Sequence, residues 1–257
     1  MVLVGLTALA GCGGDDESPG APSQTSSSPV TSSEPAPATA TDDEMTSDAG
    51  PPGTIPGTKV RVRHRGIDAS HHQGAIDWRA VANDGVSFAY LKATEGTSYI
   101  DPTFAQHRAE ALDLGLRVGG YHYFQLCSSG AEQAAHFASV VGDLREGNLL
   151  PGAVDLELAG SCPTPPARAV LLAEVRTFLR RVEALTGREP IVYLFPEFED
   201  RFGFADELGE YRQWVRSLGG RPDREWWIWQ QTDSGSVAGI AGPVDVNVMW
   251  SREVAAR

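Results

Sequence analysis

The chain has 257 residues with 34 acidic and 21 basic side chains, which give a formal net charge of −13 and a pI of about 4.8. Nucleic-acid binding needs a basic face, so this balance argues against nucleic acid as a partner. Residues 1–58 hold eight of the acids and none of the bases, which leaves 26 acids against 21 bases in residues 59–257. This second part is long enough for one sizeable core. No apolar run reaches about 20 residues, so no membrane-spanning helix is predicted.

The chain begins with a short apolar stretch that is followed by a cysteine. An apolar stretch, residues 1–11, is too short to span a bilayer but long enough for the hydrophobic part of a signal peptide. Its end, Leu9-Ala10-Gly11-Cys12, resembles a lipobox, which implies that Cys12 carries a lipid and that the protein is held on the outer face of the cell membrane. Because no Lys or Arg precedes the stretch, we expect the true start to lie upstream. The alternative is an apolar N-terminus with a chance cysteine.

The next segment, residues 13–58, is composed mainly of Ser, Thr, Pro, Ala, Gly and acidic residues, without an aromatic residue. Such a composition cannot bury enough apolar surface to offset the entropy of ordering. We therefore expect a disordered tether before a catalytic or binding domain over residues 59–257.

Short apolar runs alternate with helical patterns in that domain. One helix is predicted from Asp101-Pro102 to Gly115 and a longer one from Thr164-Pro165 to Gly187. The longer helix has one apolar face, formed by Leu171, Val175, Phe178, Val182 and Leu185. Strands are predicted at residues 65–69, 86–93, 117–124, 153–158, 190–195, 226–230 and 244–249.

The alternation of strands and helices predicts parallel strands joined by right-handed crossovers. Near the C-terminus the last two strands are separated only by the turn-rich residues 232–243. Seven or eight strands in this length favour a small or incomplete (β/α) barrel, although spacing alone leaves an open sheet as an alternative. In both folds the functional side chains are expected at the carboxyl ends of the strands.

Acidic residues stand at three of these strand ends. Asp68 ends the first strand, Asp155 and Glu157 end the fourth, and Asp245 lies in the last. Because strand side chains alternate, Asp155 and Glu157 are expected on one face, with backbones roughly 6.5 to 7 Å apart.

Carboxylates this close raise one another's pKa, so that one stays protonated while its partner is ionised. This division supplies the general acid and the anionic partner that glycoside hydrolysis requires. The spacing does not decide between retaining and inverting chemistry. The same acids could ligate Mg²⁺ or Ca²⁺, or could only cap loops and pair with Arg.

The two remaining cysteines, Cys127 and Cys162, each follow a predicted strand. If these strands are neighbours and the protein is exported, the two residues can form a disulfide. The alternative is a pair of free thiols.

Six short motifs follow one another from about residue 65 to 250. They are Gly66-Ile67-Asp68-Ala69-Ser70-His71-His72-Gln73-Gly74 with Ile76-Asp77-Trp78; Lys92-Ala93-Thr94-Glu95-Gly96 with Tyr99-Ile100-Asp101-Pro102; Gly120-Tyr121-His122-Tyr123-Phe124; Leu150-Pro151; Asp155-Leu156-Glu157; and Trp229-Gln230 with Gly242-Pro243-Val244-Asp245-Val246-Asn247. Each motif is weak alone, but their succession is highly specific and resembles that of glycoside hydrolase family 25, the lysozymes or N-acetylmuramidases.

The resemblance implies a flattened (β/α)5β3 barrel that hydrolyses the β-1,4 bond between N-acetylmuramic acid and N-acetylglucosamine in peptidoglycan. It also implies that Glu157 is the proton donor and that Asp155 stabilises the substrate's N-acetyl group as it attacks the anomeric carbon, with net retention. Asp68 and Asp245 match two further acids of the groove, and Lys92 could pair with one of these acids.

Sugar binding needs flat apolar surfaces beside hydrogen-bonding groups. Tyr121, Tyr123, Tyr193 and Trp229 come from strand ends and are candidates together with Lys92, although an aromatic residue in a strand is often part of the core.

No metal or other cofactor is predicted. His71 and His72 are neighbours that point different ways, and His122 lies in a strand, so loop or core roles are favoured over ligation. We expect a monomer. Two rival hypotheses remain at this point, a glycan-binding module without turnover and a metal-dependent phosphoesterase.

Overall fold

The structure is a computed structural model that describes residues 59–254 and the side chains of residues 62–251. The expected signal, Cys12 and the tether lie outside the described residues. None of the described helices is both long enough and apolar enough to cross a membrane.

Eight strands close into a barrel, because β1 pairs with β2 at one side and with β9 at the other. Neighbouring strands are parallel from β1 to β8, whereas β9 is antiparallel to both of its neighbours. The short β3 (Tyr99–Ile100) pairs with β2 outside the barrel. The barrel strands, in spatial order, are β1 (Lys59–Ala69), β2 (Phe88–Glu95), β4 (Arg117–Tyr123), β5 (Ala153–Leu156), β6 (Ile191–Leu194), β7 (Gln213–Arg216), β8 (Ile228–Gly235) and β9 (Val244–Val254).

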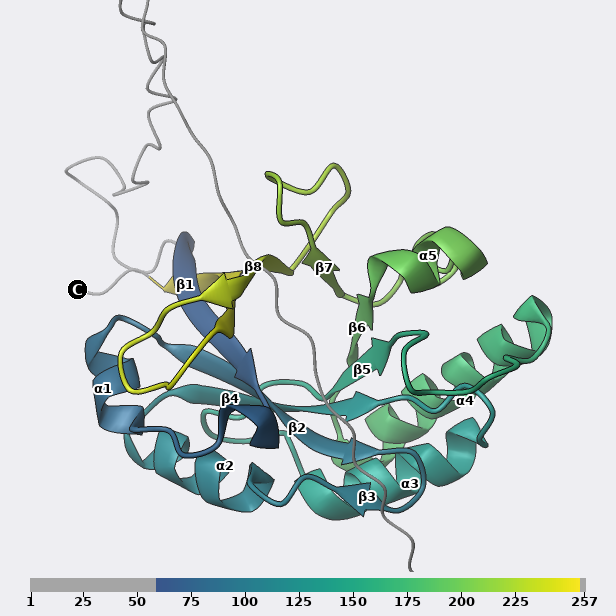
Figure 1. Ribbon diagram of the computed structural model, residues 1–257, viewed down its shortest axis with the longest axis horizontal. Helices are drawn as coiled ribbons and strands as arrows, with labels where there is room; N and C mark the ends of the chain where they lie inside the picture. The colour runs from purple at the N-terminus through teal and green to yellow at the C-terminus, as the bar shows by residue number, and fades with distance from the viewer. Residues whose placement is uncertain (1–58, 255–257) are drawn as a thin grey trace, which may run out of the picture. The chain divides into compact units, whose positions relative to one another are not determined.

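One helix follows each of the first five barrel strands, and no helix follows β7 or β8. This is the predicted (β/α)5β3 order, and the closure between β1 and β2 excludes the open sheet. Figure 1 shows α1 to α4 along the outside of the strands. The helices are α1 (Trp78–Asn83), α2 (Phe104–Asp113), α3 (Gly130–Val141), α4 (Arg168–Thr186) and α5 (Pro196–Phe202), with a 3-10 turn η1 at His71–Gln73.

The close approach of β1 and β2 explains the glycine in the first motif. Gly66 faces Phe88 across the parallel pair, and a Cβ atom at residue 66 would lie 2.3 Å from the Phe88 ring. Only glycine fits without moving the ring, so Gly66 lets the barrel close and places Asp68 at the end of the strand.

Both predicted helix starts are too early. Asp101 does not cap α2, which begins at Phe104 after Thr103, although its Oδ1 accepts a hydrogen bond from the Thr103 backbone at 2.9 Å. Helix α4 begins at Arg168, not at Thr164, and Ala167 precedes it without a side-chain cap.

The predicted apolar face of α4 is confirmed except at the C-terminal end of the helix. Leu171, Val175, Phe178 and Val182 are fully buried, but Leu185 is 50% exposed. Thr186 is buried at this end instead of Leu185. Its hydroxyl can be buried because it donates a hydrogen bond to the Val182 carbonyl at 2.8 Å.

His122 is a core residue. Its ring stacks on Phe178 and is hydrogen-bonded to Thr94 Oγ1 at 2.7 Å and to Gln133 Oε1 at 3.1 Å. Burial lowers the pKa of His122 to about 3, so the ring is neutral at physiological pH.

Cys127 and Cys162 form a disulfide, with Cα atoms 5.8 Å apart. They follow β4 and β5, which pair in parallel. This confirms the pairing expected from the placement of the two cysteines after neighbouring strands.

Candidate active site

A cavity of about 270 Å³ opens at the carboxyl ends of the parallel strands. The antiparallel β9 contributes its N-terminal end to the same rim, which brings Asp245 to the carboxylates of β1 and β5. The cavity is lined by Asp68, Ser70, His72, Lys92, Tyr121, Tyr123, Asp155, Glu157, Tyr193, Phe195, Trp214, Arg216, Gln230, Asp233 and Asp245.

Asp155 and Glu157 form the first carboxyl pair, and a hydrogen bond links their side chains. Burial raises the pKa of both groups. The charge of Glu157 raises the pKa of Asp155 further, whereas the hydrogen bond with Asp155 lowers that of Glu157 against the larger effect of burial. The pair therefore holds one shared proton over a wider pH range than two separate acids would. Asp155 Oδ1 is buried, and no amide, hydroxyl or backbone N–H group of the described residues donates to it.

Asp68 and Asp245 form a second pair, facing each other across β1 and β9. Burial and the nearby charge of Asp245 raise the pKa of Asp68, and burial also raises that of Asp245. Asp68 Oδ2 accepts hydrogen bonds from Asn247 Nδ2 at 2.7 Å and from Gln230 Nε2 at 3.3 Å. These amides hold the carboxyl group in place and offset part of the repulsion between the two acids.

Both amides are positioned in turn by aromatic side chains. Trp214 Nε1 donates to Asn247 Oδ1 at 2.8 Å, and the Tyr193 hydroxyl donates to Gln230 Oε1 at 3.0 Å. Each amide must therefore present its NH₂ group to Asp68, which sets the orientation of the second pair.

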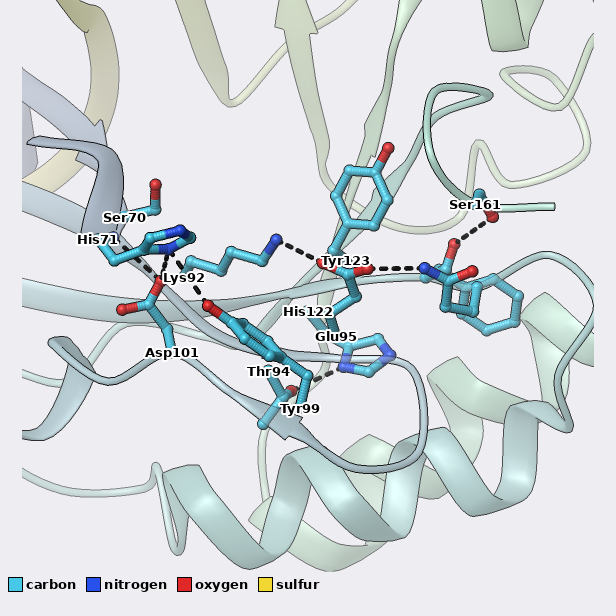
Figure 2. A network of polar contacts seen from close by, with 12 residues as sticks. Ser70, His71, Lys92, Thr94, Glu95, Tyr99, Asp101, His122, Tyr123 and Ser161 are labelled. Carbon is cyan, nitrogen blue, oxygen red and sulfur yellow. Dashed lines mark hydrogen bonds and ion pairs between the residues drawn. The ribbon is translucent and has the colours of Figure 1, made fainter. Parts of the chain in front are cut away.

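Lys92 lines the cavity, but its ion pair is with Glu95 and not with one of the four acids of the groove. The two residues lie on β2, three positions apart, with Lys92 Nζ 2.7 Å from Glu95 Oε2. Figure 2 shows Lys92 reaching toward Glu95 near the ring of Tyr123, whose centroid is 4.8 Å from Nζ. Gln125 Nε2 also donates to Glu95, which fixes this carboxylate at the rim.

The predicted sugar-binding aromatic residues do not all lie together. Tyr121 and Tyr123 line the cavity, and the Tyr123 hydroxyl donates to the Ala159 carbonyl. Tyr193 also lines it but is 6% exposed and packs against Trp214. Trp229 is not among the lining residues.

Trp229 points away from the cavity because it neighbours the inward-facing Gln230 in β8 and strand side chains alternate. Its Nε1 donates to the Ser217 carbonyl at 2.8 Å, and its ring contacts Trp226.

Several lining or supporting residues had not been predicted as site residues, among them Asn247, Gln230, Trp214 and Arg216. Asn247 could have been predicted, since it follows Asp245 by two residues and therefore lies on the same face of β9. Gln230 lay in one of the recognised motifs. Trp214 and Arg216 belong to β7, a strand that was missed because only two apolar residues, Trp214 and Val215, form it.

Other titratable residues near the rim form hydrogen bonds between the loops. His71 Nδ1 lies 2.8 Å from Asp101 Oδ2, and the hydroxyl of Tyr99 lies 3.3 Å from the same nitrogen (Figure 2). No group of three or more His, Cys, Asp or Glu side chains in the described part of the chain is arranged to hold a metal ion.

The carboxyl groups of Asp68, Asp155, Glu157 and Asp245 thus line one cavity at the carboxyl end of a (β/α) barrel, an arrangement that can serve glycoside hydrolysis. The model of the glycosyl hydrolases family 25 matches residues 67–240, and the chain belongs to this family.

Relatives with known names agree with this assignment. Lysozyme M1 of Streptomyces globisporus is 33% identical over 213 residues, which cover 77% of this chain and 72% of the relative. The crystal structure of the bacterial lysozyme of Streptomyces coelicolor has a TM-score of 0.65 and 33% identity, covering 72% of this chain and 90% of that one. For a family 25 glycosyl hydrolase of Bacillus anthracis the TM-score is 0.66 and the identity 30%, with 72% and 88% covered. The chain is therefore a glycoside hydrolase of the lysozyme type.

Proposed function

We propose that the protein is an N-acetylmuramidase that cleaves the β-1,4 bond between N-acetylmuramic acid and N-acetylglucosamine in peptidoglycan. The observation that carries this proposal is that Asp155 and Glu157 lie side by side in one cavity with Asp68 and Asp245. A protonated carboxyl group beside an ionised one supplies the general acid and the anionic partner that glycoside hydrolysis requires. The relatives named lysozyme and N,O-diacetylmuramidase support the same substrate class.

In the first step, Glu157 acts as the general acid. Its carboxyl group gives a proton to the glycosidic oxygen while the bond from this oxygen to the anomeric carbon breaks. The acetamido oxygen of the substrate attacks the anomeric carbon from the opposite face and closes an oxazolinium ring. Asp155, as a carboxylate, accepts the N–H of this ring and stabilises its positive charge.

In the second step, Glu157 acts as the general base. Its carboxylate takes a proton from a water molecule, and the oxygen of this water attacks the anomeric carbon and opens the ring. Two successive inversions give net retention. The negative charge left on the Asp68 and Asp245 pair favours the oxocarbenium-like transition states of both steps.

The products of digestion separate this proposal from its rivals. The full chain is incubated with several peptidoglycans, the new ends are reduced with borohydride, and the fragments are identified by mass spectrometry. We expect muramitol at the new ends. Glucosaminitol would contradict the proposed bond, and wall binding without new ends would favour the binding module. Activity on phosphoesters that EDTA removes would favour the phosphoesterase.

We also propose, from the sequence, that the enzyme acts outside the cytoplasm as a lipid-anchored monomer, with Cys12 as the acylated residue and residues 13–58 as the tether. Mass spectrometry of the mature N-terminus is expected to find an acylated Cys12, and Cys12→Ser is expected to release the protein from membranes. An unmodified Cys12 in membrane-bound protein would contradict the anchor.

A further inference from the structure

Arg216 is a cation of the cavity that the proposed mechanism does not use. It is the last residue of β7 and lines the cavity together with Glu157 and Asp245. Its side chain is 18% exposed. The guanidinium lies over the ring of Phe195, 5.0 Å from the centroid, and Nη2 donates to Asp233 Oδ2. An aromatic face and one carboxylate therefore hold its plane in a fixed orientation.

Most of the donors of this guanidinium remain unused. Arginine has five N–H donors, and within the described residues Asp233 is the hydrogen-bond partner of Arg216. None of its nitrogens is among the buried atoms that lack a partner, so the nitrogens without a partner are not fully enclosed by protein, and the residue itself lines the cavity. A rigid, partly buried guanidinium with a free edge is suited to bind a carboxylate through two parallel N–H bonds.

Lys92, the other cationic side chain that lines the cavity, already has an acidic partner. Lys92 lies on the β2 side, is paired with Glu95, and has the rings of Tyr99 and Tyr123 within 5.5 Å and 4.8 Å of its Nζ. Arg216 is close enough to Glu157 that its charge lowers the pKa of that carboxyl group against the larger effect of burial. An anionic group bound by Arg216 would thus lie near the bond that Glu157 protonates.

We propose that Arg216 binds a carboxylate carried by the substrate beside the cleaved bond, and so selects among glycan strands by their charged substituents. This inference rests on the proposed function. A muramic acid residue has a lactyl carboxylic acid, which is ionised only where no peptide is attached to it. Attached peptides carry carboxylates of their own. Both sources offer the same chemistry to the guanidinium.

Three soluble, uncross-linked substrates separate the two sources. The first is glycan strands with their peptides, the second is the same strands after removal of the peptides by an amidase, and the third is the second with its lactyl carboxylates converted to neutral methylamides. The kcat/KM of the full chain is measured on each, for the wild type and for Arg216→Met. The matched control is Arg212→Met, since exposed Arg212 also lies over an aromatic ring, that of Trp227, but does not line the cavity.

If the lactyl carboxylate is bound, the wild type is expected to prefer the second substrate over the third by about tenfold, the lower range for a charge-assisted hydrogen bond. If a peptide carboxylate is bound, the kcat/KM of the wild type is expected to be about tenfold higher on the first substrate than on the third. Its kcat/KM on the second and third substrates is then expected to be equal. In either case Arg216→Met brings the ratio to about one, while Arg212→Met keeps the wild-type ratio. Where Arg216→Met is too slow to measure, Arg216→Lys is expected to reduce the ratio, because Lys cannot offer two parallel bonds.

Equal cleavage of all three substrates by the wild type would overturn the role of Arg216 and leave the muramidase proposal intact. A preference that survives Arg216→Met would also overturn it. The absence of new reducing ends from every substrate would instead contradict the proposed function itself.

Discussion

Glu157→Gln is expected to reduce kcat on peptidoglycan by about 10³-fold, within the range that a positioned general acid and base contributes. The amide has nearly the shape of the carboxyl group but can neither give a proton to the leaving oxygen nor take one from water. The KM is expected to change much less, because the other lining residues stay in place. Steady-state release of reducing ends measures both values.

The matched control for this variant is Glu197→Gln. Glu197 is exposed in the first turn of α5 and does not line the cavity, so the same chemical change there should leave kcat within about twofold. A Glu157→Gln enzyme with near wild-type kcat would remove Glu157 from the proposed role.

Asp155→Asn is expected to lower kcat by about 10²-fold, the low end of the effect of losing one preorganised electrostatic partner. It is also expected to move the alkaline limb of the pH profile of kcat/KM to lower pH. In the wild type the two carboxyl groups raise the pKa at which the shared proton is lost, because its loss leaves two negative charges side by side. With a neutral amide at residue 155, Glu157 gives up its proton at lower pH, although burial still raises its pKa.

The pH profiles of the wild type and Asp155→Asn are therefore measured on the same soluble glycan. An alkaline limb that stays in place would show that the two groups are not coupled in the working enzyme. A limb that moves to higher pH would contradict the assignment of the shared proton to this pair.

The alternation of strands and helices favoured a barrel because its signals are local and repeated, but it left the open sheet as an alternative, and the (β/α)5β3 order was implied by the family resemblance. Each of the first five strands is an apolar run that a helix follows, and the acids stand where parallel strands end. Strand β7 was missed because its four residues contain only Trp214 and Val215 as apolar residues, and its existence depends on pairing with β6 and β8. Strand β8 was predicted at residues 226–230 but runs from Ile228 to Gly235. The apolar residues Trp226 and Trp227 precede it, and its last residues are polar or Gly.

The four acids of the candidate site could be named from the sequence, but the contacts that orient them could not. A carboxylate inside an apolar run is a visible local signal. The contacts that orient it come from distant strands, as Asn247 and Gln230 do for Asp68. Lys92 was expected to pair with one of these acids; it lines the same cavity, but its ion pair is with Glu95 on its own strand. Trp229 and Gln230 are adjacent, and only the register of β8 decides which of them faces the cavity.

The anomeric configuration of the first product tests the central claim most directly. Proton NMR follows the new reducing ends during the first minutes of cleavage of a soluble glycan, before mutarotation mixes the anomers. Attack by the substrate's own N-acetyl group, with Asp155 stabilising the ring and Glu157 activating water, predicts that the β anomer appears first. An α anomer that appears first would mean direct attack by water on the opposite face, and would contradict this account of the site.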